Sequence, residues 1–156
     1  MAFNMCRSLK SVTFAEGSQL TEIPYFCFAD NEALTAIEIP SLVTTLGECI
    51  LEQRKPRQRH PSGRLKTIGK EAFCACNAMT TIDLPAALES IGESAFSGCS
   101  NLATVTCLAT TPPTLGENAF SNCADGLQIL VPFGSVDAYK QASVWSEYAD
   151  KIVAIP

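Results

Sequence analysis

Histidine is almost absent from this sequence: the 156 residues contain one, His60. Imidazole is the usual general base of hydrolytic triads and a common ligand of catalytic zinc. A single histidine therefore excludes most catalytic dyads and triads and all histidine-rich metal sites. We predict that the protein is not an enzyme and that it has no catalytic residues, no metal site and no cofactor.

Basic side chains are scarce as well. Lys and Arg total 11 against 16 Asp and Glu, for a net charge of −5 at pH 7, which argues against a general affinity for phosphate backbones or anionic lipids. No run approaches the ~18 apolar residues that a membrane span needs. The first ten residues show no basic start followed by an apolar stretch. We expect no nucleic-acid partner, no membrane insertion and no export signal in this chain.

What the sequence does contain is a repeat of about 23 residues. Its clearest copy runs from Met79 to Cys99 and reads Met-Thr-Thr-Ile-Asp-Leu-Pro, then Ala-Ala-Leu-Glu-Ser-Ile-Gly, then Glu-Ser-Ala-Phe-Ser-Gly-Cys. The element Ala-Phe-x-x-Cys recurs with its phenylalanine at Phe3, Phe73, Phe96 and Phe120. Five positions before the phenylalanine position stands an aliphatic residue, usually followed by glycine, at Ile23, Leu46, Ile68, Ile91 and Leu115.

Apolar residues also alternate over a short stretch in most copies. The stretches are Val12-x-Phe14, Ile37-x-Ile39, Ile82-x-Leu84 and Val105-x-Cys107. Period-two alternation predicts one short strand per repeat with one buried face. A single unit cannot bury its own Leu, Ile and Phe, so neighbouring units must stack and share one core. The predicted fold class is an α/β repeat solenoid, mostly β and loop, with stacked parallel strands.

The pattern closely resembles the BspA-type leucine-rich repeat, whose consensus is L-x-x-I-x-I-P followed by L-x-x-I-G-x-x-A-F-x-x-C. The match covers almost the whole chain. This resemblance implies a right-handed leucine-rich-repeat solenoid with one short parallel strand per repeat and no catalytic centre. It also implies a bacterial cell-surface or secreted protein that adheres to host matrix proteins, host cell-surface proteins or bacterial proteins. Because Met1 falls inside an Ala-Phe-x-x-Cys unit, we expect the chain to be the C-terminal part of a longer solenoid.

The end of the chain resembles the closing module of the same family. We divide the chain into leucine-rich repeats over residues 1–126 and a C-terminal strand with a small helical cap over residues 127–156. Ser135 is predicted to be the N-cap of a helix near residues 136–142. The aromatic side chains expected to cover the last rung are those of Tyr139, Trp145 and Tyr148.

Residues 49–64 break the repeat, which resumes at Leu65. Five of the 11 basic residues and one of the 16 acidic residues fall in this segment, so the rest of the chain carries 6 and 15, a net charge of −9. The basic residues are Arg54, Lys55, Arg57, Arg59 and Arg64. One hypothesis is a compensated frameshift, because a neighbouring reading frame can encode a regular Ser-Ala-Phe-type repeat here. The other is a genuine basic loop, either solvated or in contact with anionic glycans or phosphate.

The cysteines allow two interpretations. Four of the eight stand at one repeat position: Cys6, Cys76, Cys99 and Cys123. We predict that they are small buried hydrophobes stacked rung on rung. Adjacent rungs lie close enough for an occasional disulfide, which the pattern does not require.

The candidate binding face consists of strand residues that alternate away from the core. They are Ser11, Thr13, Glu38, Thr81, Asp83, Thr104, Thr106 and Gln128. Small polar side chains there form a hydroxyl-rich, mildly acidic surface of the extended kind that solenoids use for protein partners. We therefore predict a non-enzymatic protein-interaction module. The alternatives are a structural spacer and a glycan-binding module, which would need exposed aromatic residues on this face.

Overall fold

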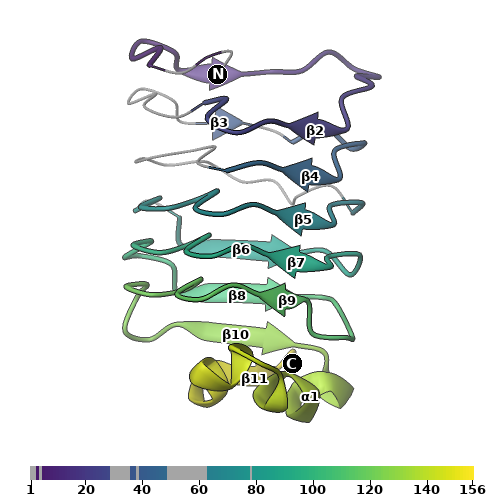
Figure 1. Ribbon diagram of the computed structural model, residues 1–156, viewed down its shortest axis with the longest axis vertical. Coiled ribbons are helices and arrows are strands. Elements are labelled where there is room, and N and C mark those ends of the chain that lie inside the picture. Colours follow the sequence, from purple (N-terminus) through teal and green to yellow (C-terminus); the bar gives the residue numbers. More distant parts are fainter. Residues whose placement is uncertain (1–2, 4, 29–35, 38, 49–62, 78) are drawn as a thin grey trace.

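The chain forms a stack of similar turns that is closed at the C-terminal end by helices (Figure 1). This is a computed structural model, which describes every residue except 1–2, 4, 29–35, 38, 49–62 and 78. Successive turns place the same repeat positions above one another, so residues about one repeat apart in the sequence become neighbours in space. The predicted class of fold is confirmed: parallel strands and loops dominate, with one short α-helix near the C-terminus.

The predicted strands over residues 81–84 and 104–107 lie in a sheet of strands with three or four residues each. β6 (Thr81–Leu84), β8 (Thr104–Cys107), β10 (Gln128–Val131) and β11 (Ile152–Ala154) make a four-stranded parallel sheet in the order β11-β10-β8-β6. We call it the long-strand sheet. β1 (Ser11–Val12) and β3 (Ala36–Ile37) pair in parallel as a separate two-stranded sheet nearer the N-terminus.

A second strand in each repeat, which the sequence did not predict, corrects the expectation of one strand per repeat. β2 (Glu22–Ile23), β4 (Thr45–Leu46), β5 (Thr67–Ile68), β7 (Ser90–Ile91) and β9 (Thr114–Leu115) form a five-stranded parallel sheet, called here the short-strand sheet. Each of these strands has two residues, which is too short to show an alternating pattern. Its only sequence signal is the aliphatic residue followed by glycine.

The recurring glycine is explained by the close approach of successive turns. A Cβ atom on Gly92 would lie 2.5 Å from the backbone nitrogen of Lys70 and 2.6 Å from the carbonyl carbon of Gly69, distances that real Cβ atoms do not reach. The Gly92 N–H donates to the carbonyl of Ile68 on the preceding turn at 2.8 Å. Gly47, Gly69 and Gly116 meet the preceding turn in the same way. The glycine thus allows the backbones to come close enough to bond.

The phenylalanine of each repeat lies between two left-handed backbone positions. Positive φ angles occur two residues before it, at Glu71, Ser94 and Asn118, and two residues after it, at Ala75, Gly98 and Asn122. These turns direct the ring into the core, where Phe73, Phe96 and Phe120 stack with centroids 5.2 and 5.3 Å apart. The N–H of Phe73 donates to the carbonyl of Ala95, and that of Phe96 to the carbonyl of Ala119, both at 2.8 Å. One repeat is thereby bonded to the next.

The cysteines at the shared repeat position behave as predicted inside the stack but not at its start. Cys76 and Cys99 are buried, Cys123 is partly buried, and Cys6 in the first turn is exposed. Buried thiols need an acceptor, and the Sγ of Cys99 donates to the carbonyl of Phe73 at 3.0 Å, while that of Cys123 donates to Phe96 at 3.4 Å. All seven cysteines that the structure describes are thiols.

Alkaline pH is expected to destabilise the fold through such thiols. Burial raises the pKa of Cys123 to about 12, whereas a thiol in an unfolded chain ionises near pH 8.5. Between about pH 9 and pH 12 the unfolded chain therefore binds fewer protons, and the free energy of unfolding falls by up to ~1.4 kcal/mol per pH unit. Urea unfolding at a series of pH values measures this slope. The Cys123→Ala variant should have a shallower slope, and an unchanged slope would contradict the assignment.

The C-terminal cap replaces the contacts that a further repeat would make. It comprises a 3₁₀ turn η1 (Phe133–Ser135), the helix α1 (Val136–Gln141), the 3₁₀ segment η2 (Trp145–Lys151) and β11. The Phe120 ring meets Trp145 and Tyr148 with centroids 6.0 and 5.6 Å away. The Phe120 N–H donates to the hydroxyl of Tyr148 at 3.3 Å, where earlier repeats use a carbonyl of the next turn. The prediction that these aromatic residues cover the last rung is confirmed.

Ser135 has a different role from the predicted one. It does stand at the N-cap position of α1, but its side chain makes no capping hydrogen bond. The hydroxyl donates instead to the carbonyl of Thr110 at 2.8 Å. Nearby, Tyr139 donates to Ala109 at 2.8 Å and the Trp145 indole to Pro113 at 2.7 Å. The cap is therefore held by side chains that bond to carbonyls of the last turn, and Ser135 belongs to that set.

Candidate functional site

The outward residues of the long-strand sheet form continuous rows across the strands. Thr81 is paired with Thr104, and Thr104 with Gln128. Their neighbours along the chain, Ile82, Val105 and Ile129, are buried, so alternation turns the polar residues toward solvent. The structure thus brings Thr81, Thr104 and Gln128 together on one face, as the sequence predicted.

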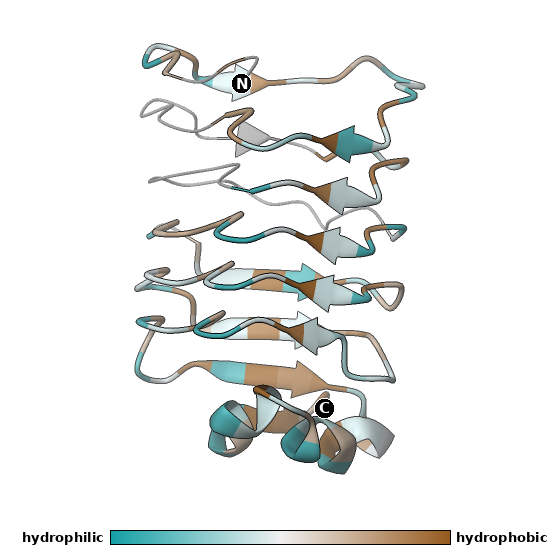
Figure 2. Ribbon diagram, in the orientation of Figure 1, coloured by the Kyte–Doolittle hydropathy of each residue, from teal (hydrophilic) through white to brown (hydrophobic). Residues whose placement is uncertain are grey.

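A second row changes character along the stack. Asp83 is paired with Thr106, Thr106 with Leu130, and Leu130 with Val153. The row therefore passes from a carboxylate through a hydroxyl to two aliphatic side chains. Leu108, which directly follows the last residue of β8, adds another exposed aliphatic side chain near this row. Figure 2 shows the same change, because the β10 arrow is apolar over most of its length whereas β6 is mixed. Val153 and Leu108, at the apolar end of this face, were not among the residues predicted to line it.

The remaining predicted residues of the face lie apart or outside the described chain. Ser11 and Thr13 are exposed in and beside β1, which pairs with β3 and not with the long-strand sheet. Glu38 falls outside the described residues, as do Arg54, Lys55, Arg57 and Arg59. Arg64 is described and exposed, directly before the buried Leu65 where the repeat resumes. The basic loop over residues 49–64 stays a prediction.

The short-strand sheet carries a ladder of opposite charges that sequence reasoning missed. Lys66 pairs with Glu89 at 2.6 Å and Lys70 with Glu93 at 3.1 Å. The hydrogen bond and charge of Glu93 raise the pKa of Lys70, which keeps the ammonium form. Each pair joins residues one repeat apart, and that spacing was the signal in the sequence that could have revealed them. Because these pairs are solvent-exposed, they contribute little to stability.

The part of the chain that the structure describes lacks the features of two other classes of site. No group of three or more His, Cys, Asp or Glu residues there could hold a metal ion. No helix among these residues is long and apolar enough to cross a membrane.

Comparison with protein families gives the same repeat. The model of the BspA type leucine rich repeat region matches in six copies over residues 1–58 and 66–141. The chain belongs to the BspA-type leucine-rich repeat family. As a member of this family, the chain is a repeat protein-interaction module. The BspA-type family is generally non-enzymatic. The unmatched residues are 59–65, which overlap the end of the segment where the repeat breaks, and 142–156 at the end of the chain. A comparison with curated proteins found no match.

Proposed function

We propose that this BspA-type module mediates adhesion, as part of a bacterial cell-surface or secreted protein that binds host or bacterial proteins through the long-strand sheet. The observation that supports the proposal is the in-register face of Thr81, Asp83, Thr104, Thr106 and Gln128. These side chains are short and keep the face accessible, and their hydroxyl, carboxylate and amide groups can all hydrogen-bond to a partner. An extended surface of this kind is what solenoids use for recognition.

Binding is expected to depend on this face and not on the other sheet. The test is a screen of purified extracellular matrix proteins and glycans by biolayer interferometry, followed by variants against any saturable ligand. Thr106→Arg places a long charged side chain at the centre of the proposed face and should weaken binding by about tenfold or more. Thr67→Arg is the matched control, because Thr67 has the same partial exposure on the short-strand sheet.

Three results would count against adhesion through this face. Equal losses for Thr106→Arg and Thr67→Arg would place the contact elsewhere. Binding to glycans alone would make the protein a glycan-binding module. No binding across the whole panel would favour a structural spacer that presents another domain.

A further inference from the structure

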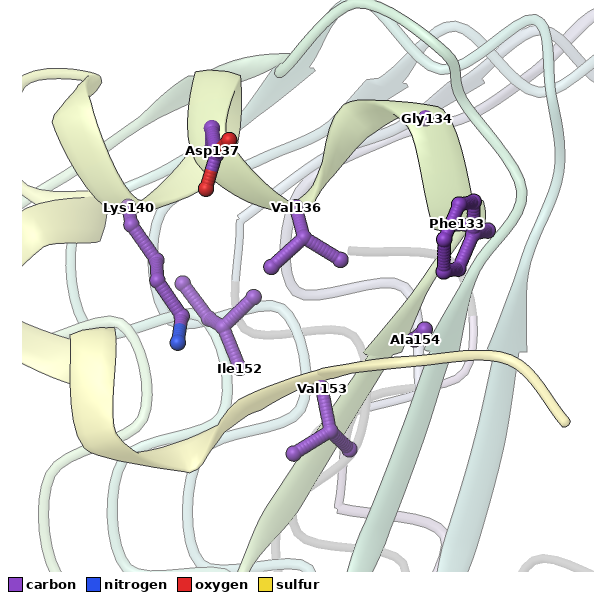
Figure 3. A pocket seen from close by; sticks show the side chains of 8 residues that line it. All are labelled: Phe133, Gly134, Val136, Asp137, Lys140, Ile152, Val153 and Ala154. Atoms are coloured by element: carbon purple, nitrogen blue, oxygen red, sulfur yellow. The ribbon is translucent and has the colours of Figure 1, made fainter.

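A groove opens at the C-terminal end of the solenoid, between α1 and β11 (Figure 3). Its volume is about 530 Å³. The lining residues include Phe133, Val136, Lys140, Ile152, Val153 and Ala154. In Figure 3 the side chains of Val136 and Ile152 both project into the space between helix and strand. The groove is therefore mainly apolar. It adjoins the apolar end of the long-strand face at Val153, whereas none of the polar residues proposed for adhesion lines it.

One side of the groove is the edge of a β-sheet. β11 is the terminal strand of the long-strand sheet, and no strand lies beyond it among the residues that the structure describes. Ile155 donates its N–H to Val131 on β10 at 2.8 Å, so the N–H of the preceding Ala154 points to the opposite, outer side. The N–H of Ile152 also points outward, to the carbonyl of Ala149. The Ala154 amide and the Ile152 carbonyl are thus presented at the edge, two residues apart.

β11 is short, which is one of the usual protections of an edge strand, but it carries no charged residue, proline or bulge. Natural edge strands are commonly blunted by charged residues, proline or a bulge, whereas β11 reads Ile-Val-Ala. Apolar surface is exposed beside it, with Phe133 at 85 % and Val153 at 38 %. A phenylalanine exposed to this extent next to an apolar groove is typical of a contact surface.

The rim of the groove carries one charge of each sign. Asp137 and Lys140 stand three residues apart on α1, and both are exposed. No ion pair involving either of them is found within the described ranges. Two-fold symmetry places residue i against residue j and residue j against residue i. A second copy of α1 running antiparallel would therefore bring each Asp137 to a Lys140.

We propose that this groove is a self-association surface at which two copies of the chain pair about a two-fold axis. β11 meets its counterpart in antiparallel orientation, so that the Ala154 N–H of each copy donates to the Ile152 carbonyl of the other. Phe133 and Val153 are covered in the contact, and Asp137 faces Lys140 twice. A two-fold pair is favoured over an unrelated partner because the edge, the apolar residues and the charges are each complementary to themselves. This inference is independent of the proposed adhesion.

The first test is the oligomeric state of the whole chain, measured by sedimentation equilibrium over a wide range of loading concentrations. A reversible monomer–dimer equilibrium is expected. Phe133→Ser should weaken the dimer by roughly thirtyfold or more if the ring is a central anchor. Tyr25→Ser is the matched control, because Tyr25 is another exposed aromatic residue, at 58 %. It follows shortly after β2, which lies far from the cap in the stack (Figure 1). Tyr25→Ser should leave the dimer unchanged.

A charge exchange tests the symmetry itself. Asp137→Lys and Lys140→Asp each place like charges opposite one another at two points and should weaken the dimer by about tenfold. The double variant Asp137→Lys/Lys140→Asp exchanges the charges and should restore it. Thermal unfolding of each variant, at a concentration where it is monomeric, shows whether the fold is intact.

Several results would overturn the proposal. A chain that remains monomeric at the highest concentration has no such surface, and the groove would then serve an extended segment of another protein. A dimer that Phe133→Ser leaves unchanged forms elsewhere. A dimer weakened by both single charge variants but not restored by the double variant does not have the two-fold arrangement.

Discussion

Replacing Trp145 by alanine is expected to lower the free energy of unfolding by about 3–5 kcal/mol. The side chain is 1 % exposed and contacts both the last phenylalanine of the stack and the Tyr139 ring, whose centroid is 4.9 Å away. Truncation removes this packing and leaves the carbonyl of Pro113 without its indole donor. Because single domains are stable by only ~5–15 kcal/mol, this one change should remove a large part of the total. Urea unfolding followed by circular dichroism measures it.

Two variants separate the packing of the cap from general sensitivity of the C-terminal region. Phe133→Ala removes another large ring from the same cap, but one that is 85 % exposed, so little change in monomer stability is expected. Tyr148→Phe keeps the ring contact with Phe120 and removes only the hydroxyl that accepts the Phe120 N–H. Its expected cost is about 1–3 kcal/mol, the cost of a buried donor left without an acceptor. A Trp145→Ala effect no larger than that of Phe133→Ala would mean that the cap is not needed for stability.

The sequence was sufficient to predict the stacked turns, one strand in each and the buried rings, because every turn has the same constraints, but it did not predict the short-strand sheet. Alternation at Ile82 and Leu84 identified a strand, and the fixed spacing to Phe96 placed the buried ring. The start of the cap helix was also predictable, because α1 begins at Val136, directly after Ser135. In each case the signal is local and recurs at a known period.

What the sequence could not reveal depends on contacts between segments that do not repeat. The hydroxyl of Ser135 could accept a capping hydrogen bond from the start of α1 or donate to another segment, and the structure shows that it donates to the Thr110 carbonyl. β11 was not expected, because its three apolar residues follow the cap with no alternation to identify them. The groove beside β11 arises only when α1 packs near that strand. Cys6 follows the repeat pattern but is exposed.

Pro24 departs from the glycine that the repeat otherwise has at its position. It occupies the place that glycine takes after Leu46, Ile68, Ile91 and Leu115. There the glycine N–H donates to a carbonyl of the preceding turn, a bond that proline cannot make. Among the described residues no strand precedes β2 in the short-strand sheet, so Pro24 breaks no bond that the structure describes.

The same reasoning predicts that Gly92→Ala is among the most damaging single substitutions in the chain. Its new Cβ would lie 2.5 to 2.8 Å from three backbone atoms of the preceding turn. Backbone atoms cannot rotate away, so the turns must separate and stretch the bond from Gly92 to Ile68. We expect a loss of about 3–5 kcal/mol in the free energy of unfolding, measured by urea unfolding.

Two other glycines serve as controls for the Gly92→Ala result, because an added Cβ at either of them would not collide with the preceding turn. Gly98 has a φ of +75° but its added Cβ would make only ordinary contacts, 3.5 Å or longer, so Gly98→Ala should cost about 1–2 kcal/mol of backbone strain. Gly126 has neither a positive φ nor any atom within 4 Å of the added Cβ, and Gly126→Ala should be nearly neutral. Equal losses at Gly92 and Gly98 would mean that backbone conformation, and not the approach of one turn to the next, makes the repeat require glycine. The expected order of the losses in free energy of unfolding is Gly92→Ala far above Gly98→Ala, and Gly98→Ala above Gly126→Ala. This order would mean that the turns can approach one another because glycine has no side chain.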